Sequence, residues 1–593
     1  MDIIKEISTI KENYQSGTIT ILDGLTHSQR SIIQKIEFYT NSQYINGMFD
    51  EFNRYKPFYN IVNFRVNVAV KATDLDTKDI QVYAENPKHS VHSMIFNKAV
   101  KNWMREEDFS KTLNTIGFTR AKYGGVLVKK VMKNGKLCIE VPEWKNLITD
   151  QVDIANGVKI EKHYLTPVQI QAKRGVWENL EENCDDIIEI FESLDDGNYT
   201  NSSRICVLEV EGEFENEYVN ETPEEEYSLQ KHIVICDATE NPQILVHSEK
   251  LKESSYKYLP WLEASGRGLG IGIVEDGFNA QYATNDMILK QNDILELSAK
   301  AIVVTDSDTI ENNILSDTKT GDMIKVEKGD QTQVLNLMPA SFPQLEQIKQ
   351  AWDDQYSRVS SSFEAVTGET MPSGTPFRSI AIQNQEAQST FNYRREEMGI
   401  FLREIFTDWI IPYLAKKLSK QHILASDFED DELAMIDDAF AKYTANQFVI
   451  DQLLAGKVTT QEEYNDMITA QKQIMSSTFK KRRFLDVPDN FFKDVEMKLD
   501  IITTGEQINK TAVFETISNM IAVIASNPAV TQDPILKKLL AKAIELSGIG
   551  INIDALMAQV PTQTPNTPQI APQGSTEALQ APSDIQPEAS IQA

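Results

Sequence analysis

The chain has 593 residues, of which 41% are hydrophobic and 25% charged, and its formal net charge is −30. This composition is typical of a soluble chain with two to four domains and a sizeable core. It argues against three classes of protein: no apolar run approaches the ~20 residues that span a bilayer, the N-terminus lacks the apolar stretch of a signal peptide, and four widely spaced cysteines do not form a disulfide framework.

The negative charge is concentrated in one segment. Between Glu178 and Glu226 the chain has 18 acidic residues and a single basic one, Arg204. Two interpretations stay open: a solvated surface that repels polyanions, or an acidic face that docks a basic partner. Neither suits tight binding of phosphates, which needs a basic footprint. The charge is compatible with a protein that DNA passes without sticking to it.

The N-terminal third combines helical and strand patterns. A helix is predicted around residues 62–70, a short strand at 80–83, and a single long helix from about 92 to 118. Residues 1–24 are only weakly patterned. His89 and His92 lie three residues apart, but without a third ligand they do not indicate a metal site.

Strand patterns follow. Two strand-like runs, residues 125–133 and 136–141, flank the dipeptide Asn134-Gly135. Asn-Gly is the strongest short signal for a β-hairpin, because a type I′ turn needs a positive φ at both positions. A further strand is predicted from about residue 204 to 219, with its glutamates on one solvated face and its apolar side chains on the other.

Glycine then occupies every second position from Gly266 to Gly272, and a long helical pattern follows over residues 274–300. Asp286 and Lys290 are spaced to form an i,i+4 ion pair in the favourable order. A buried helix reached through a flexible loop, as in many enzymes, also fits this pattern. A dinucleotide fingerprint does not, because neither frame of the run has a glycine at the third position of G-x-G-x-x-G.

A small β unit separates this helix from a second one. Strand-like runs occur within residues 301–341, and a helix with a regular 3.6-residue period follows over 342–366, with Trp352 and Tyr356 in its apolar stripe. The next segment, 367–376, contains two glycines and two prolines, which end the helix. A third long helix is predicted after it.

The C-terminal part is helical and then low in complexity. Residues 425–484 predict charged helices, 494–503 a returning strand, and 511–546 two further helices. Lys480–Arg483 is the sole basic cluster and predicts a solvated turn or, alternatively, a phosphate contact. From residue 559 onward the chain is rich in Pro, Gln, Thr and Ser and cannot bury enough apolar surface to order itself.

The sequence contains no recognisable catalytic motif. Gly135-Lys136 and Gly456-Lys457 lack the upstream glycine of a P-loop, H-E-x-x-H does not occur, and Ser265 lacks the flanking glycine of a nucleophile elbow. We therefore expect no catalytic residues, no cofactor and no metal site.

Three passages resemble the portal proteins of tailed double-stranded DNA bacteriophages, the head-to-tail connector proteins of the capsid vertex. They are residues 54–70, 117–150 and 260–300, and the last contains R-G-L-G-I-G-I-V-E-D before a long, amide-rich helix. The order of helix, β unit and helix is similar to the stem, clip and stem of portals. The resemblance implies an α+β, portal-like fold with a wing, long stem helices, an inserted β clip and a helical crown.

The resemblance also implies a division of the chain. Its parts would be a wing of N-terminal helices and an antiparallel β region (1–257), a first stem helix with its glycine-rich lead-in (258–300), a clip (301–341), a second stem helix (342–366), a tunnel loop (367–376), a long helix with the C-terminal wing part (377–504), crown helices (505–558) and a disordered tail (559–593). The side chains singled out are Asp286, Lys290, Trp352 and Tyr356 in the stem, and Thr370, Met371, Ser373, Gly374 and Thr375 in the tunnel loop, where they would face DNA in the channel.

A function and partners follow from the same resemblance. The subunits would form a homo-oligomeric ring, by family a dodecamer, through which double-stranded DNA is packaged and ejected without sequence preference. Its protein partners would be the major capsid protein, terminase and then head–tail connector or adaptor proteins. It would reside in the virion, at the capsid portal vertex, and in the host cytoplasm during assembly, without a membrane.

A portal would not be an enzyme, because a separate terminase hydrolyses ATP. Two alternatives stay open: another capsid or connector structural protein, and a nucleotide-binding enzyme with a glycine-rich loop at 266–272.

Overall fold

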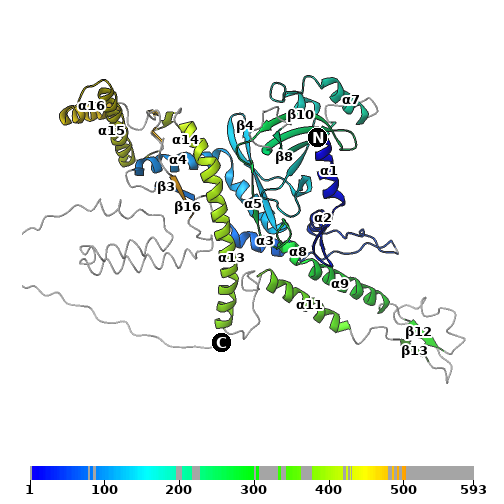
Figure 1. Cartoon of the computed structure of the whole chain (residues 1–593). Coiled ribbons are helices and arrows are strands. Elements are labelled where there is room, and N and C mark those ends of the chain that lie inside the picture. Colours follow the sequence, from blue (N-terminus) through cyan, green and yellow to red (C-terminus); the bar gives the residue numbers. More distant parts are fainter. Residues whose placement is uncertain are drawn as a thin grey trace, which may run out of the picture. The chain divides into compact units, whose positions relative to one another are not determined.

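The structure is a computed structural model of the chain (Figure 1). It describes residues 3–51, 53–75, 77, 80–84, 89–194, 203–216, 227–298, 302–305, 332–335, 342–361, 377–418, 422–424, 428, 430–477, 484–486, 491–492 and 497–501. Residues 1–507 form one compact unit, which contains all the described residues, and residues 508–593 form a second. The described part mixes helices with antiparallel sheets and is α+β, as the sequence predicts.

A five-stranded antiparallel sheet in the order β10-β9-β8-β7-β6 is covered on both faces. Helix α1 (Ile3–Ser16) packs on one face through Ile3, Ile7 and Tyr14. Helices α6 (Pro167–Gln171) and α7 (Cys184–Leu194) pack on the other. The strands are β6 (Leu147–Thr149), β7 (Lys159–Leu165), β8 (Ile205–Glu215), β9 (Tyr227–Cys236) and β10 (Pro242–Lys250).

A three-stranded sheet contains the predicted hairpin. Strands β4 (Gly125–Lys133) and β5 (Lys136–Glu140) pair from Lys133 opposite Lys136, and β11 (Tyr256–Pro260) pairs with the other edge of β4. Asn134 and Gly135 have φ angles of 51° and 77°, as a type I′ turn requires. The hairpin prediction is therefore confirmed.

The predicted single helix over residues 92–118 is wrong, because the chain forms two helices here. Helix α4 (Ser90–Glu106) ends before Asp108, whose φ of 49° is left-handed, and α5 (Phe109–Tyr123) begins after it. The break turns Trp103 and Phe109 toward one another, with ring centroids 5.4 Å apart in the same core. Tertiary packing has overridden a continuous helical period.

Several helices and strands near the N-terminus were not predicted from the sequence or were predicted only in part. Residues 1–24, which predict little, contain α1, whose apolar face is covered by the five-stranded sheet. The helix predicted around residues 62–70 is confirmed. The remaining elements of this region are β1 (Ile19–Leu22), β2 (Leu25–His27), α2 (Gln29–Thr40), α3 (Val62–Thr73), β3 (Ile80–Ala84) and the 3₁₀ turn η3 (Trp144–Asn146).

The largest core lies where the third long helix meets α4 and α5. Helix α13 (Phe377–Ile405) continues through a π-helical turn, η5 (Phe406–Ile410), into α14 (Ile411–Leu418), and buries Leu402, Ile405 and Phe406 against them. Strand β16 (Met497–Ile501) pairs with β3, so the predicted returning strand is confirmed. The other C-terminal elements are β14 (His422–Leu424), α15 (Asp430–Leu454), α16 (Gln461–Ser477) and β15 (Phe484–Asp486).

The prediction that the glutamate face of β8 is exposed to solvent is wrong for the centre of the strand. Glu211 is 2% exposed and the side chain of Glu209 is 15% exposed, whereas Glu213 is exposed. The three-stranded sheet covers these two glutamates, and Lys129 of β4 donates to Glu209 at 2.6 Å. Period-two alternation shows which side chains share a face but not whether another sheet covers that face.

Candidate functional site

The candidate site is a pair of helices that follows the glycine-rich segment. Helices α9 (Phe278–Ser298) and α11 (Phe342–Val359) run side by side (Figure 1). Strands β12 (Ile302–Thr305) and β13 (Thr332–Leu335) lie between them in sequence and pair antiparallel with each other. A short helix, α8 (Ile273–Asp276), precedes the pair. The predicted order of helix, β unit and helix is present among the described residues.

Tyr356 holds the C-terminal end of α11 against α8. Its ring is 1% exposed, and its hydroxyl donates a hydrogen bond to the carbonyl of Ile273 at 2.9 Å. Burial raises the pKa of this hydroxyl far above its ordinary value, so it stays a donor. The ring lies against Gly277, where a Cβ would come within 2.5 Å of the tyrosine Cζ. This close approach explains the glycine between α8 and α9.

Two buried amides on the first turns of α9 bind the segment that precedes α3. The side chain of Gln281 accepts from the backbone N–H of Ile61 at 2.9 Å and donates to the carbonyl of Tyr59 at 2.6 Å. Asn285 accepts from the N–H of Tyr59 at 3.0 Å. These bonds satisfy backbone groups that neither a helix nor a sheet would pair. Buried hydrogen bonds therefore join the base of the helix pair to the rest of the unit.

Contacts of the outer part are polar and more exposed. Gln291 of α9 donates to Glu346 near the start of α11 at 3.1 Å, whereas Tyr356 near the end of α11 lies against Gly277 just before α9, so the helices are antiparallel. The predicted ion pair between Asp286 and Lys290 is present at 2.6 Å. Arg54 forms ion pairs with Asp293 and Glu296 near the C-terminal end of α9. None of the described side chains of α9 after Asn285 is buried. The contacts given for the outer half of the pair are thus hydrogen bonds and ion pairs rather than buried apolar packing.

An apolar stripe on α11 faces solvent. Ile348, Trp352 and Val359 are 43%, 37% and 50% exposed, and their spacing of four and seven residues puts them on one side of the helix. Tyr356 is the buried residue of α11. Large apolar side chains gathered on one exposed face indicate an interaction surface.

Three N–H groups of the glycine-rich segment are hydrogen-bonded within the chain. The N–H of Gly268 donates to the carbonyl of Gln151 at 2.7 Å, that of Gly270 to the Tyr258 hydroxyl at 3.1 Å, and that of Ile271 to the carbonyl of Leu262 at 2.8 Å. A phosphate cradle needs several such groups pointing at the ligand. The segment instead packs against the start of β4, where added Cβ atoms at Gly270 and Gly272 would clash with Gly124.

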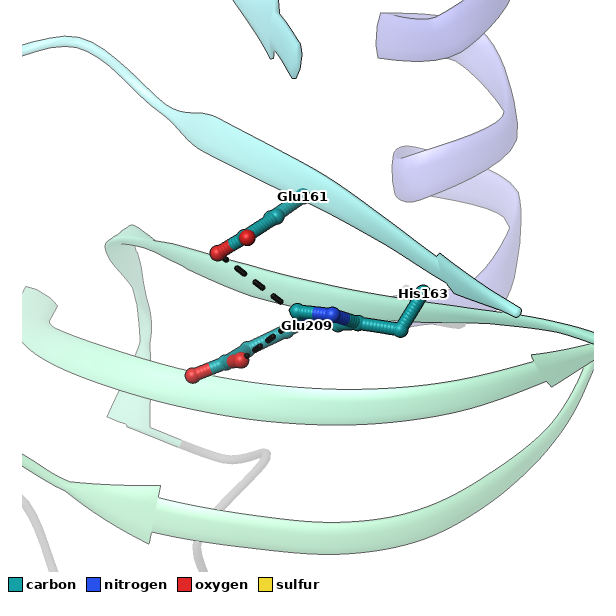
Figure 2. A group of neighbouring side chains, drawn as sticks. All are labelled: Glu161, His163 and Glu209. Atoms are coloured by element: carbon teal, nitrogen blue, oxygen red, sulfur yellow. Dashed lines mark hydrogen bonds and ion pairs between the residues drawn. The ribbon is translucent and has the colours of Figure 1, made fainter. Parts of the chain in front are cut away.

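The described residues contain one cluster with the residue types of a metal site, Glu161, His163 and Glu209, shown in Figure 2. His163 Nε2 lies 3.1 Å from a carboxylate oxygen of Glu209 and 3.6 Å from one of Glu161. The ammonium of Lys129 donates to both carboxylates at 2.6 Å. The cation between these carboxylates is therefore provided by the chain itself, and the cluster fits a structural ion network better than a metal centre.

The electrostatics of this cluster agree with a structural role. Burial alone would raise the pKa of Glu209, but the hydrogen bond with His163 and the charges of Lys129 and Lys231 outweigh burial and hold this pKa well below its ordinary value. Tyr256 closes the network by donating to Glu161 at 3.2 Å. The ions thus join the two sheets rather than open toward a ligand.

The sequence-predicted site residues have different outcomes. Asp286 and Lys290 pair on an exposed face of α9, Tyr356 is buried at the base, and Trp352 lies in the exposed stripe, so these four do not form one pocket. The tunnel-loop residues Thr370, Met371, Ser373, Gly374 and Thr375 lie outside the described residues, as do the predicted crown helices and tail.

Sequence reasoning missed three residues that hold the helix pair, Gly277, Arg65 and Arg54. Arg65 pairs with Asp353 of α11 at 3.0 Å, and Arg54 with Asp293 of α9 at 3.3 Å. The partners are 288 and 239 residues away in the chain, so no local pattern connects them. Of the three, only Gly277 has a signal in the sequence, because it is a glycine within a helical pattern.

Comparison with known proteins adds no family. No protein-family model matches the chain, and no curated protein matches it in sequence. Among the described residues, no helix has both the length and the apolar character needed to cross a membrane.

Proposed function

We propose that this chain is the subunit of a portal of a tailed double-stranded DNA phage, with a portal-like wing, stem, clip and crown. The observation that carries the proposal is the helix pair α9 and α11, rooted in the core at Tyr356 and separated in sequence by a paired β unit. In this proposal the two helices are the stem and the segment between them is the clip. The loop at 367–376 faces the DNA, and the ring docks terminase and then head–tail connector proteins.

The charge of the helix pair supports passage of DNA rather than its capture. Together α9 and α11 carry six acidic and three basic side chains. A surface with this balance does not accumulate the phosphate contacts that hold DNA, and exposed charges are screened beyond about 10 Å at 0.1 M salt. DNA would slide along such a wall without sequence preference, as a packaging channel requires.

The exposed stripe of α11 supports assembly into a ring. Ile348, Trp352 and Val359 are apolar and lie outside the core of the single chain. A ring needs heterologous contacts, in which one patch meets a different patch on the neighbouring subunit. In this proposal the stripe is one of the two patches, and it contacts a different surface of the neighbouring subunit.

The hydrogen bonds of the glycine-rich segment count against phosphate binding there. The N–H groups of Gly268, Gly270 and Ile271 are already hydrogen-bonded within the chain. A nucleotide there would have to break these bonds and separate the segment from β4. Another capsid or connector protein stays the alternative, and the shape of the particle distinguishes it from a portal.

Mass photometry and negative-stain microscopy of the purified protein test the proposal. Twelve copies of the 67.1 kDa chain would weigh about 805 kDa. We expect ring particles near this mass with a central hole wide enough for duplex DNA. Monomers at every concentration, or a closed particle without a hole, would contradict a portal.

A further inference from the structure

The outer face of the five-stranded sheet has a small lobe with an apolar groove. The lobe consists of α6, α7 and the segment between them, and is defined here as residues 167–194. A groove of about 100 Å³ runs between the two helices. Its apolar lining is Pro167, Ile170, Leu180, Ile187, Ile188 and Phe191.

Part of this apolar surface faces solvent. Ile188, in the groove, is 43% exposed, and Val168 and Val176 of the same lobe are 58% and 62% exposed. Burying Ile187 and Phe191 against the sheet accounts for folding of α7, but it does not account for these three side chains. Exposed apolar side chains on a lobe that also has an apolar groove indicate a binding surface.

Acidic side chains outnumber basic ones on the lobe, although one basic residue, Arg174, lines the groove itself. The lobe has seven carboxylates and two basic residues, Lys173 and Arg174, and all nine are exposed. None of these seven carboxylates takes part in an ion pair among the described residues, in contrast to Glu161 and Glu209, which have lysine partners. The carboxylates are Glu178, Glu181, Glu182, Asp185, Asp186, Glu189 and Glu192.

We propose that this groove docks a basic amphipathic helix of another protein. An apolar groove on an acidic lobe matches a helix that places apolar side chains at i, i+3 or i+4 and i+7 in the groove and lysines or arginines on its flanks. Helix α7 has 11 residues, about 16 Å, which suits two to three turns of a partner. Because the lobe is acidic, charge complementarity requires a partner helix with a positive net charge. The proposal does not depend on the portal function.

The same charges argue against other occupants. A second copy that docked through the same lobe would bring another acidic lobe against this one, and their like charges oppose that contact. Anionic lipid surfaces would be repelled for the same reason. An amphipathic basic segment is the chemistry that satisfies both the apolar groove and the acidic charge of its lobe.

A labelled 14-residue peptide of leucine and lysine at helical spacing tests the proposal by fluorescence anisotropy on the full chain. Two control peptides separate the contributions: leucine with glutamate removes the charge match, and lysine with serine removes the apolar face. We expect the leucine–lysine peptide to bind at least tenfold more tightly than either control. Equal binding of the lysine–serine peptide would overturn the proposal, because it would show attraction to net charge alone.

Matched variants locate the binding. We expect Ile188→Asp, and the double variant Glu181→Lys with Glu182→Lys, to weaken binding at least tenfold. The controls are Val458→Asp, an exposed apolar residue elsewhere, and the double variant Glu462→Lys with Asp466→Lys on α16; each should change binding less than twofold. Losses as large in the controls as in the lobe variants would overturn the proposal.

Alkylation of Cys184 reports on the groove without any substitution. Cys184 lines the groove and is partly exposed, and Cys138 on β5 is a partly exposed thiol outside it. We expect the leucine–lysine peptide to slow maleimide modification of Cys184 several-fold and to leave Cys138 unchanged. Unprotected Cys184 at saturating peptide would place the peptide elsewhere and contradict the proposal, as would self-association of the chain that Ile188→Asp removes.

Discussion

Lys129 joins the two sheets through charge. Its side chain is 6% exposed, and its ammonium lies 2.6 Å from carboxylate oxygens of both Glu161 and Glu209. Burial opposes its charge, but the two carboxylates outweigh burial and raise the pKa of the ammonium. Removing one partner of a buried ion pair leaves the other charge without compensation.

We therefore expect Lys129→Met to destabilise the chain by roughly 3 kcal/mol. The measurement is the thermal unfolding midpoint, followed by circular dichroism. Lys130→Met, one residue along the strand and paired with the exposed Glu253, is the matched control and should have little effect. Equal effects of the two substitutions would show that the buried ion pairs of Lys129 stabilise the chain no more than the exposed ion pair of Lys130.

His27 predicts a dependence of stability on pH. Burial, reinforced by the charge of Arg267, lowers the pKa of His27 from 6.5 to about 4. The folded state thus binds a proton less readily than the unfolded state, so stability is complete above pH 6.5 and falls as the pH decreases toward 4. We expect His27→Gln to reduce the slope of the unfolding midpoint between pH 6.5 and 4.5. An unchanged slope would mean that His27 titrates equally in both states.

Gly277 predicts a steric effect at the base of the helix pair. A Cβ at this position would clash with the ring of Tyr356, so Gly277→Ala should displace Tyr356 and loosen α11. Limited proteolysis should then cut near α11 earlier than in the parent chain. Gly117→Ala in α5, where nothing lies within 4 Å, is the control and should stabilise slightly through its helix propensity. Equal proteolysis of both variants would contradict the close packing.

At the scale of elements, the sequence predicted those turns and helices that depend on residues close together in the chain. The Asn134-Gly135 turn and the helical periods of α9 and α11 are carried by neighbouring residues, and the structure contains them. The break at Asp108 could not be predicted, because it depends on packing between Trp103 and distant parts of the chain. The same holds for Glu209 and Glu211 in β8: the strand was predictable, but the sheet that covers it was not.

The stripe on α11 carries a prediction at this scale. If it contacts a neighbouring subunit, Trp352→Glu should shift the population from rings toward monomers in mass photometry, while the circular dichroism spectrum stays unchanged. Met435→Glu, at an exposed apolar position of α15, is the matched control and should leave assembly intact. Loss of rings in both variants would indicate a general effect of added charge.

At the scale of the whole molecule, the candidate site could be predicted only in part. The helix pair and its ion pair between Asp286 and Lys290 follow from spacing along the chain. The bonds that root the pair, from Gln281 to Tyr59 and from Arg65 to Asp353, join segments more than 200 residues apart. Composition gave the sign of the charge, but whether acidic residues are buried beside Lys129 or exposed on the α6–α7 lobe depends on tertiary packing.

A cryo-electron microscopy reconstruction of the assembled protein tests the central claim most directly. We expect a ring in which α9 and α11 of successive subunits stand side by side around an open channel wide enough for duplex DNA. In that ring, the stripe of Ile348, Trp352 and Val359 should lie against a neighbouring subunit. A reconstruction in which these helices lie away from any channel, or a particle that never closes into a ring, would contradict the claim.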